Sequence, residues 1–201
     1  RASPRTQSAL LESMNESQVS IEGKTNSLSK VFTVIATQNP IAFHGTYPLP
    51  EAQLDRFYMQ LELGYPGIED ELKMLNTQQY QHPLVHLSSV TDAESVFQAR
   101  EEVKTITMGK EVCHYLLDIV EESRKDTRLK LGISPRGSLA FYRVAQAKAW
   151  SQERDFVIPD DLKKIAVDVL SHRLVLETKV YHSGTLAKEV IKDILGKTKV
   201  R

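Results

Sequence analysis

The sequence predicts a mixed fold in which part of an α/β domain is followed by a helical bundle. The run Val31–Ala36 is apolar, does not alternate and is rich in β-branched residues, which is typical of a parallel strand buried on both faces. Residues 57–63 alternate between apolar and polar side chains and indicate a half-buried strand at the edge of the same sheet. After the Gly/Pro-rich segment 64–67 the pattern is helical, so we expect an α/β part over residues 1–66 and a helical part over residues 67–201.

The α/β part contains three further predicted elements. Ser3 followed by Pro4 is a favourable helix start, because a hydroxyl N-cap precedes a proline at the first helical position. Alternating residues and a turn at Gly23 indicate a β-hairpin within residues 18–30, inserted before the central strand. A short helix is expected over Pro50–Phe57, between the central strand and the edge strand.

The helical part is divided by turn residues into six predicted helices. Two have clear start signals, a capping box from Thr91 to Glu94 and a hydroxyl N-cap at Ser134 before Pro135. All six place apolar side chains at helical spacing. They are expected at residues 68–75, from Thr91 onward, at 112–120, at 134–149, at 162–169 after Pro159, and at 186–194, ending near Gly196.

Composition excludes several classes of protein. The 201 residues are 41% hydrophobic and 26% charged with a formal net charge of zero, so no global field would attract nucleic acid or a membrane surface. Cys113 is the only cysteine, which rules out an intrachain disulfide and fits a reducing compartment, so we expect the cytoplasm. No apolar run approaches the roughly 18 residues of a membrane span. The basic run from Arg124 to Lys130 lacks interleaved aromatic residues, so nucleic-acid binding is not expected and a solvated surface is.

No phosphate-binding loop and no metal site is expected in the chain. Two Gly-Lys-Thr triplets, at residues 23–25 and 196–198, lack the first glycine of a Walker A motif and the helix that should follow it. Residues 115–118 imitate the apolar run and acid of a Walker B strand, but their helical period continues past Asp118. His82 and His86 have helical spacing, yet the proline between them and the absence of further ligands argue against zinc.

Two long segments, residues 34–40 (VIATQNP) and 45–57 (GTYPLPEAQLDRF), resemble the MoxR family of AAA+ ATPases. The resemblance extends backward through residues 1–12 and, more loosely, forward from Ile133 to the end. It implies the later part of an AAA+ core over residues 1–66 and a helical lid over residues 67–201, without Walker A or Walker B. It also implies ATP and Mg²⁺ as cofactors, with magnesium ligands outside this chain. A homo-oligomeric, hexameric ring and a client protein, which in this family can carry a von Willebrand factor A domain, follow from the same resemblance.

The resemblance assigns three site residues, each of which also has a structural alternative. Asn39 matches the first sensor, which positions the water that attacks the γ-phosphate; otherwise it caps a turn. Arg56 matches the arginine finger that reaches a neighbouring subunit's nucleotide, and we expect it to face outward; otherwise it is a surface ion-pair residue. Arg136 matches the second sensor, a lid arginine that contacts the γ-phosphate; otherwise it forms a salt bridge on the bundle surface.

Two other interpretations stay open at this point. The first is a related ring subunit of the magnesium chelatase or DNA helicase type. The second belongs to another class, a helical protein-interaction module without enzymatic activity. The coding sequence upstream of Arg1 would discriminate between them, because a phosphate loop there would establish an ATPase.

Overall fold

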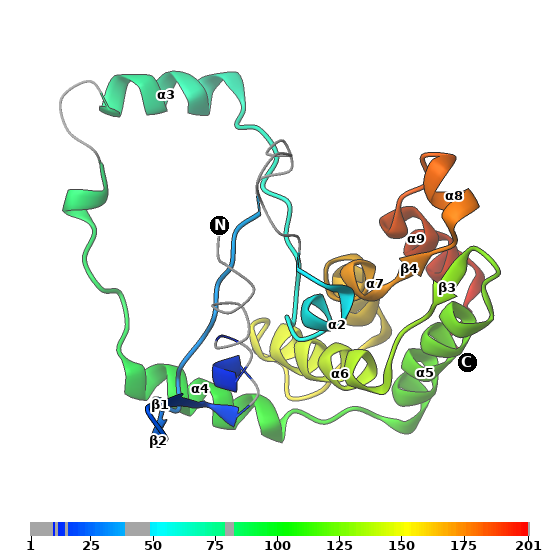
Figure 1. Cartoon of the computed structure of the whole chain (residues 1–201), viewed down its shortest axis with the longest axis horizontal. Helices are drawn as coiled ribbons and strands as arrows, with labels where there is room; N and C mark the ends of the chain where they lie inside the picture. The colour runs from blue at the N-terminus through cyan, green and yellow to red at the C-terminus, as the bar shows by residue number, and fades with distance from the viewer. Residues whose placement is uncertain (1–9, 11, 15, 39–48, 79–82, 201) are drawn as a thin grey trace.

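The computed structural model describes residues 10, 12–14, 16–38, 49–78 and 83–200. Figure 1 shows a compact carboxyl-terminal bundle and a more open amino-terminal half in which α3 lies far from the bundle. The elements in chain order are β1 (Gln18–Ile21), β2 (Lys24–Ser27), α2 (Glu51–Leu54), α3 (Ile68–Gln78), η1 (Pro83–His86), α4 (Ala93–Thr105), α5 (Lys110–Lys125), β3 (Leu129–Leu131), α6 (Pro135–Trp150), α7 (Pro159–Leu170), η2 (Ser171–Arg173), β4 (Val175–Leu176), α8 (Thr178–His182) and α9 (Ala187–Lys197).

The predicted hairpin is confirmed. Strands β1 and β2 pair in antiparallel register from Gln18 opposite Ser27 to Ile21 opposite Lys24. The two turn residues, Glu22 and Gly23, both have positive φ angles of 51° and 77°, as the tight turns that match strand twist require. The Gly-Lys-Thr triplet at residues 23–25 therefore starts in a hairpin turn, where it has no following helix to bind phosphate.

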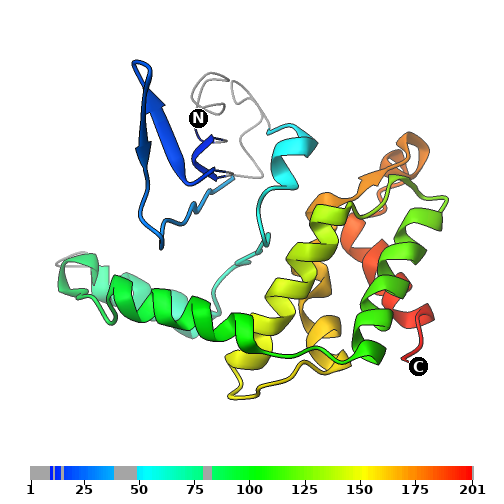
Figure 2. The same cartoon turned by 90° about the horizontal axis from the view of Figure 1, so that it is seen from below.

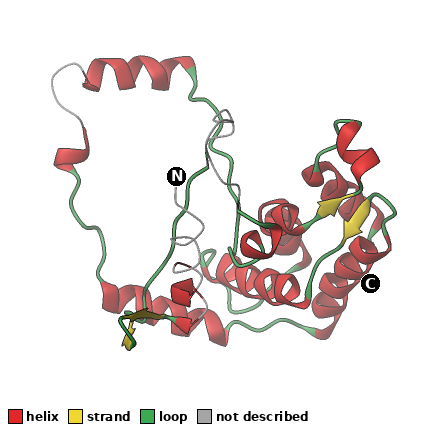
Figure 3. Ribbon diagram, viewed as in Figure 1, coloured by secondary structure: helices red, strands yellow, loops and turns green. Residues whose placement is uncertain are grey.

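The two predicted strands of a parallel sheet are not formed, which corrects the expectation for Val31–Ala36 and residues 57–63. Both sheets among the described residues are two-stranded antiparallel pairs, β1–β2 and β3–β4 (Figure 3). Ile35 is 88% exposed and Leu63 is 97% exposed, so neither segment is covered. A buried parallel strand needs a neighbouring strand that pairs with it, and no strand among the described residues pairs with either segment.

The six helices predicted within residues 67–201 are confirmed with two local corrections, whereas the helix start predicted at Ser3 and Pro4 lies outside the described residues. Helix α4 begins one residue later than its predicted capping box implies, because Asp92 rather than Thr91 is the N-cap and accepts a hydrogen bond from the Ser95 backbone N–H at 2.8 Å. Leu139, one of the apolar residues at helical spacing in the predicted 134–149 helix, is 68% exposed, so it does not belong to the buried face of α6. The N-cap of α6 is Ser134 as predicted, and Pro159 starts α7. Start signals and helical periodicity therefore located the lid helices well.

The bundle core lies between α5, α6, α7 and α9, which Figure 2 shows side by side. Its largest fully buried apolar side chains are Tyr115, Phe141, Ile119, Ile133, Leu162, Leu170 and Ile191. Small residues of α6, Ala145 and Ala149, are fully buried and allow close helix packing. None of the helices in the described part of the chain is both long and apolar enough to cross a bilayer.

Helix α4 connects the bundle to the segment that leads toward Asn39. Glu102 of α4 accepts a hydrogen bond from the indole N–H of Trp150 in α6, at 2.8 Å. Arg100 donates to the Lys30 carbonyl at 2.6 Å and to the Thr33 hydroxyl at 2.8 Å. The same helix therefore touches the lid on one side and residues 30–33 on the other.

Candidate functional site

The short helix α2 packs against the bundle, where it meets η2 and the start of α6 (Figure 1). We call this region the α2–lid corner and define it as residues 55–57, 134–137 and 172–173. The backbone N–H of Gln60 also donates to the Asp168 carbonyl of α7, at 2.9 Å. The corner therefore joins the segment that carries Arg56 to the helix that carries Arg136.

A buried ion pair lies at the centre of the α2–lid corner. Arg173 Nη1 lies 2.7 Å from Asp55 Oδ1, and the exposed fractions of the two side chains are 1% and 22%. The Ser134 hydroxyl donates to the same carboxylate, 3.1 Å from Oδ2 and 3.3 Å from Oδ1. Two lid elements, η2 and α6, thus hold one carboxylate of the α2 segment through charge-assisted hydrogen bonds.

Arg173 also holds the backbone on both sides of Arg56. Its Nη1 donates to the Asp55 carbonyl, and its Nη2 donates to the Phe57 carbonyl at 2.5 Å. Its Nε donates to the Val169 carbonyl of α7 at 2.8 Å. All three nitrogens of the guanidinium therefore have protein acceptors, which a desolvated charge requires.

The start of α6 is shaped to admit the Arg173 side chain. Gly137 is buried, and a Cβ atom placed there would lie 3.1 Å from Arg173 Cδ and 2.8 Å from Ile133 Cγ2. The Ser134 hydroxyl accepts from the Gly137 N–H at 3.1 Å while it donates to Asp55. One hydroxyl therefore caps the helix and binds the α2 segment.

His172 supplies a further contact to the same backbone. Its Nε2 lies 3.1 Å from the Phe57 carbonyl and must donate to it, which leaves Nδ1 without a proton in the neutral ring. Nδ1 is buried and has no hydrogen-bond partner among the described residues. Burial, reinforced by the positive charge of Arg173, lowers the pKa of His172, although the bond to the Phe57 carbonyl raises it. The corner therefore favours the neutral imidazole.

Arg56 is half-buried, which corrects the expectation of an outward-facing side chain. Its Nε and Nη1 are shielded from solvent, and none of the described residues forms a hydrogen bond with either atom. The reason is local: its neighbours, Asp55 and Phe57, are both bound to the lid, so the chain holds Arg56 close to the bundle. Shielded guanidinium donors without an acceptor are costly unless an anion completes the site.

The structure describes the position of Arg136 but not that of Asn39. Arg136 is exposed in the first turn of α6, where the partial positive charge of the helix start adds to its own. Asn39 lies outside the described residues. The structure thus brings the elements that carry Arg56 and Arg136 together and leaves the position of Asn39 untested.

The residues that hold the corner were missed by the sequence analysis. Ser134 was interpreted only as a helix cap, and Asp55, His172 and Arg173 were not singled out. An arginine after the apolar end of a helix carries no local signal of a partner 118 residues away. The one available hint was the Ser-Pro-Arg-Gly sequence from Ser134 to Gly137, where a helix start includes a glycine without obvious local need.

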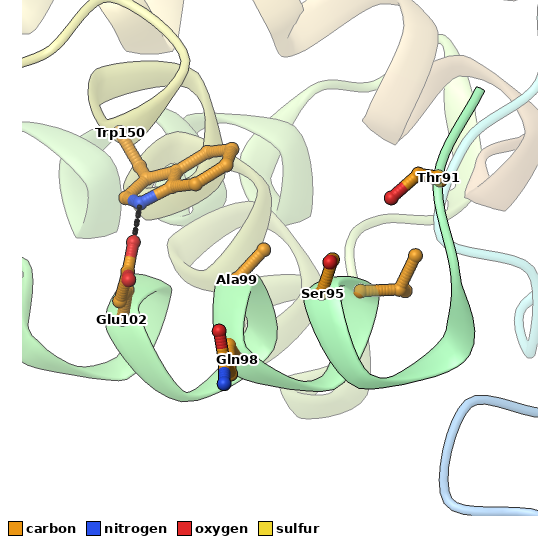
Figure 4. Close-up of a pocket in the computed structure, with 7 residues that line it drawn as sticks. Thr91, Ser95, Gln98, Ala99, Glu102 and Trp150 are labelled. Carbon is orange, nitrogen blue, oxygen red and sulfur yellow. Dashed lines mark hydrogen bonds between the residues drawn. The ribbon is translucent and has the colours of Figure 1, made fainter.

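The surface between α4 and α6 has a recess that is not assigned as a site. A shallow groove of about 310 Å³ lies between α4 and the end of α6 (Figure 4). It is lined by Thr91, Ser95, Val96, Gln98, Ala99, Glu102 and Trp150. Its carboxylate, Glu102, is engaged by the Trp150 indole, and the described residues contain no group of three potential metal-ligating side chains.

The basic run lies in ion pairs on the bundle. Arg124 and Lys125 pair with Glu121 within α5. Arg128 pairs with Asp126 at 2.7 Å and with Asp193 of α9 at 2.6 Å. These side chains are occupied by neighbouring carboxylates, in agreement with the predicted surface role.

Two family profiles match the chain. Residues 1–59 match the ATPase family associated with various cellular activities (AAA), and residues 121–194 match the AAA lid domain. The first match ends two residues after Phe57, and the second includes Ser134, Arg136 and Arg173. The α2–lid corner therefore joins residues of both profiles.

Several known proteins are similar to the chain along nearly its whole length. YeaC of Bacillus subtilis, itself uncharacterized, is 42% identical over 200 residues, which are 100% of this chain and 62% of YeaC. The chaperone MoxR1 of Mycobacterium tuberculosis is 37% identical and matches 97% of this chain and 52% of its own length. The crystal structure of an inferred ATPase from Cytophaga hutchinsonii matches with a TM-score of 0.91 and 33% identity, covering 100% of this chain and 64% of that one.

The fold, the two profiles and the solved structure define the class of protein as an AAA+ ATPase, represented here by part of its core and its lid. Within that class, the chain belongs to the MoxR family and corresponds to its carboxyl-terminal part, without Walker A or Walker B motifs. The chain spans between about half and two thirds of the length of these relatives.

Proposed function

We propose that this chain is part of an ATPase that hydrolyses ATP with Mg²⁺ and uses movement of its lid to remodel or mature partner proteins. The observation that carries the proposal is the α2–lid corner, where Asp55 binds both Arg173 and Ser134. This contact joins the segment of a proposed arginine finger to the helix of a proposed sensor. Such a connection suits a motor whose lid position must correspond to its nucleotide state.

Three residues have proposed roles in ATP hydrolysis. Asn39 would orient the attacking water, Arg56 would neutralise charge on the transferred phosphoryl group of a neighbouring subunit, and Arg136 would bind the γ-phosphate. None of the described residues binds Nε or Nη1 of Arg56, so both donors are left for an anion such as a phosphate group. We propose that the Mg²⁺ ligands and the phosphate loop lie outside this chain, because its sequence contains neither a Walker A nor a Walker B motif.

The assembly, location and clients are part of the same proposal. A finger that acts between subunits requires a heterologous ring, and a hexamer is proposed from the family. We also propose a cytoplasmic protein, a division of core and lid near residues 66 and 67, and a client protein that can carry a von Willebrand factor A domain. A magnesium chelatase-like or helicase-like ring is the second candidate. The sequence relatives named MoxR favour the chaperone-like role.

Calorimetry with Mg²⁺-ATP tests the assignment of nucleotide binding. The isolated chain is expected to show no micromolar binding, because it lacks the phosphate loop that supplies most direct contacts. The complete ATPase that includes this chain is expected to bind and hydrolyse ATP. Micromolar binding by the isolated chain, or no hydrolysis by the complete protein, would contradict the proposal.

A further inference from the structure

We propose that Arg173 is a positioning residue for Arg56, fixing the arginine finger to the lid so that its place follows lid movement. The inference rests on the proposed role of Arg56 and adds to it a residue that determines where the finger lies. Arg173 lies in η2 and is 7% exposed, so its guanidinium serves the protein interior and not solvent.

Arg173 binds the short stretch of chain that contains Arg56. Its acceptors in the α2 segment are the carboxylate and carbonyl of Asp55 and the carbonyl of Phe57, the two residues that flank Arg56. Fixing the backbone on both sides leaves Arg56 only its side-chain rotations. A planar guanidinium suits this task because its donors have a fixed mutual geometry, which a lysine cannot reproduce.

A contribution to stability alone does not explain the ion pair between Arg173 and Asp55. Buried ion pairs are often no more stabilising than well-packed apolar residues, because desolvation offsets their attraction. The lid has its own buried pair, Arg154 with Asp161 at 2.6 Å, which lies entirely within the bundle. The pair of Arg173 with Asp55 instead connects two parts of the chain and is joined by Ser134, the cap of the helix that carries Arg136.

The bundle also makes room for the Arg173 side chain. A Cβ at Gly137 would approach Arg173 Cδ to 3.1 Å, closer than ordinary contact, and Ile133 Cγ2 to 2.8 Å. The start of α6 is therefore built around Arg173. A rigid-body movement of the lid would carry Arg173, and through it the residues flanking Arg56, as one unit.

A double-mutant cycle in the complete ATPase separates positioning from simple stabilisation. Arg173→Lys keeps the positive charge but loses the planar guanidinium with its several donors. We expect kcat to fall about 10²-fold, the effect of misplacing a catalytic group by roughly 1 Å, and the affinity for ATP to stay unchanged. In an Arg56→Ala background, the same Arg173→Lys change should lower kcat no further, since no finger remains to misplace. Arg154→Lys, which alters the matched pair inside the lid, should lower the melting temperature without changing kcat.

Asp55→Asn provides a second variant should Arg173→Lys fail to fold, because it preserves the shape of the side chain while it removes the charge and one of the two acceptor oxygens. It should show the same loss of kcat and the same lack of additivity with Arg56→Ala. Losses that multiply in the Arg56→Ala background, or wild-type kcat in both corner variants, would overturn the inference. Wild-type kcat in Arg56→Ala itself would instead remove the proposed finger, so the two failures are distinguishable.

Discussion

The buried pair between Arg154 and Asp161 gives a stability prediction whose size and pH dependence both follow from the structure. Arg154 donates to the two oxygens of Asp161 at 2.6 and 2.9 Å, and the side chains are 22% and 1% exposed. Arg154→Met leaves a buried carboxylate with the Ile158 N–H, at 3.0 Å, as its remaining hydrogen-bond donor. Removing one partner of such a pair costs about 3 kcal/mol, the lower end of the range because Arg154 is partly exposed.

The pH dependence of this loss has a definite sign. Burial raises the pKa of Asp161, but the bonds from Arg154 and Ile158 outweigh it and hold the pKa below its ordinary value. In the wild type the resulting stabilisation is therefore present above the unfolded pKa and is lost as pH falls through the lower folded pKa. In Arg154→Met burial dominates and the folded pKa rises, so the charged form is penalised at pH 7 and the penalty is relieved on acidification.

Urea denaturation followed by circular dichroism and by the single tryptophan, Trp150, measures both effects. We expect the free energy of unfolding of Arg154→Met to lie about 3 kcal/mol below wild type at pH 7, and the gap to narrow toward pH 4. Lys163→Met is the matched control, because its pair with Asp160 is 46% and 65% exposed and should cost less than about 1 kcal/mol. Equal losses in the two variants, or a gap that widens on acidification, would refute the reasoning.

Three further results are expected. Burial lowers the pKa of His172, so the stabilisation of the fold by the neutral imidazole is present above the unfolded pKa and is lost as pH falls. Between pH 7.5 and 5.5 the free energy of unfolding should therefore fall more for wild type than for His172→Gln. Equal losses would count against a buried neutral imidazole. Phe141→Ala removes a fully buried ring and should lower the free energy of unfolding by about 3–5 kcal/mol in urea titrations, while a loss below about 1 kcal/mol would contradict the described core. In the complete ATPase, Arg136→Ala should abolish the lid closure that an ATP analogue induces in solution scattering, and retained closure would exclude Arg136 as the coupling sensor.

Local signals were sufficient for the lid and insufficient for the core segments. The helix starts at Ser134 and Pro159 could be predicted because capping and proline placement act within one turn. Val31–Ala36 has the composition of a buried strand, yet a strand exists only when another strand pairs with it. Sequence periodicity therefore predicts which secondary structure a segment can form, but a strand forms only when a neighbouring strand is there to pair with it.

In the candidate site too, residues with local sequence signals could be predicted and residues with distant partners could not. Arg56 and Arg136 could be singled out because they lie within or beside recognisable sequence segments. Arg173 could not, since its partner Asp55 lies 118 residues away and only folding brings the two together. The half-burial of Arg56 was missed for the same reason, because it results from the binding of its neighbours to the lid.

Arg56 is proposed to complete the active site of a neighbouring subunit in a ring, and this role can be tested without a structure of the ring. Its most direct test mixes two inactive forms of the complete ATPase, Arg56→Ala and a variant with its phosphate-loop lysine replaced. Each has the part that the other lacks, so random mixing in equal amounts should make about a quarter of the interfaces functional in a heterologous ring. Hydrolysis that rises above both parents and peaks near equal mixing is the predicted result. If mixed rings form and no mixture exceeds either parent, Arg56 does not act between subunits.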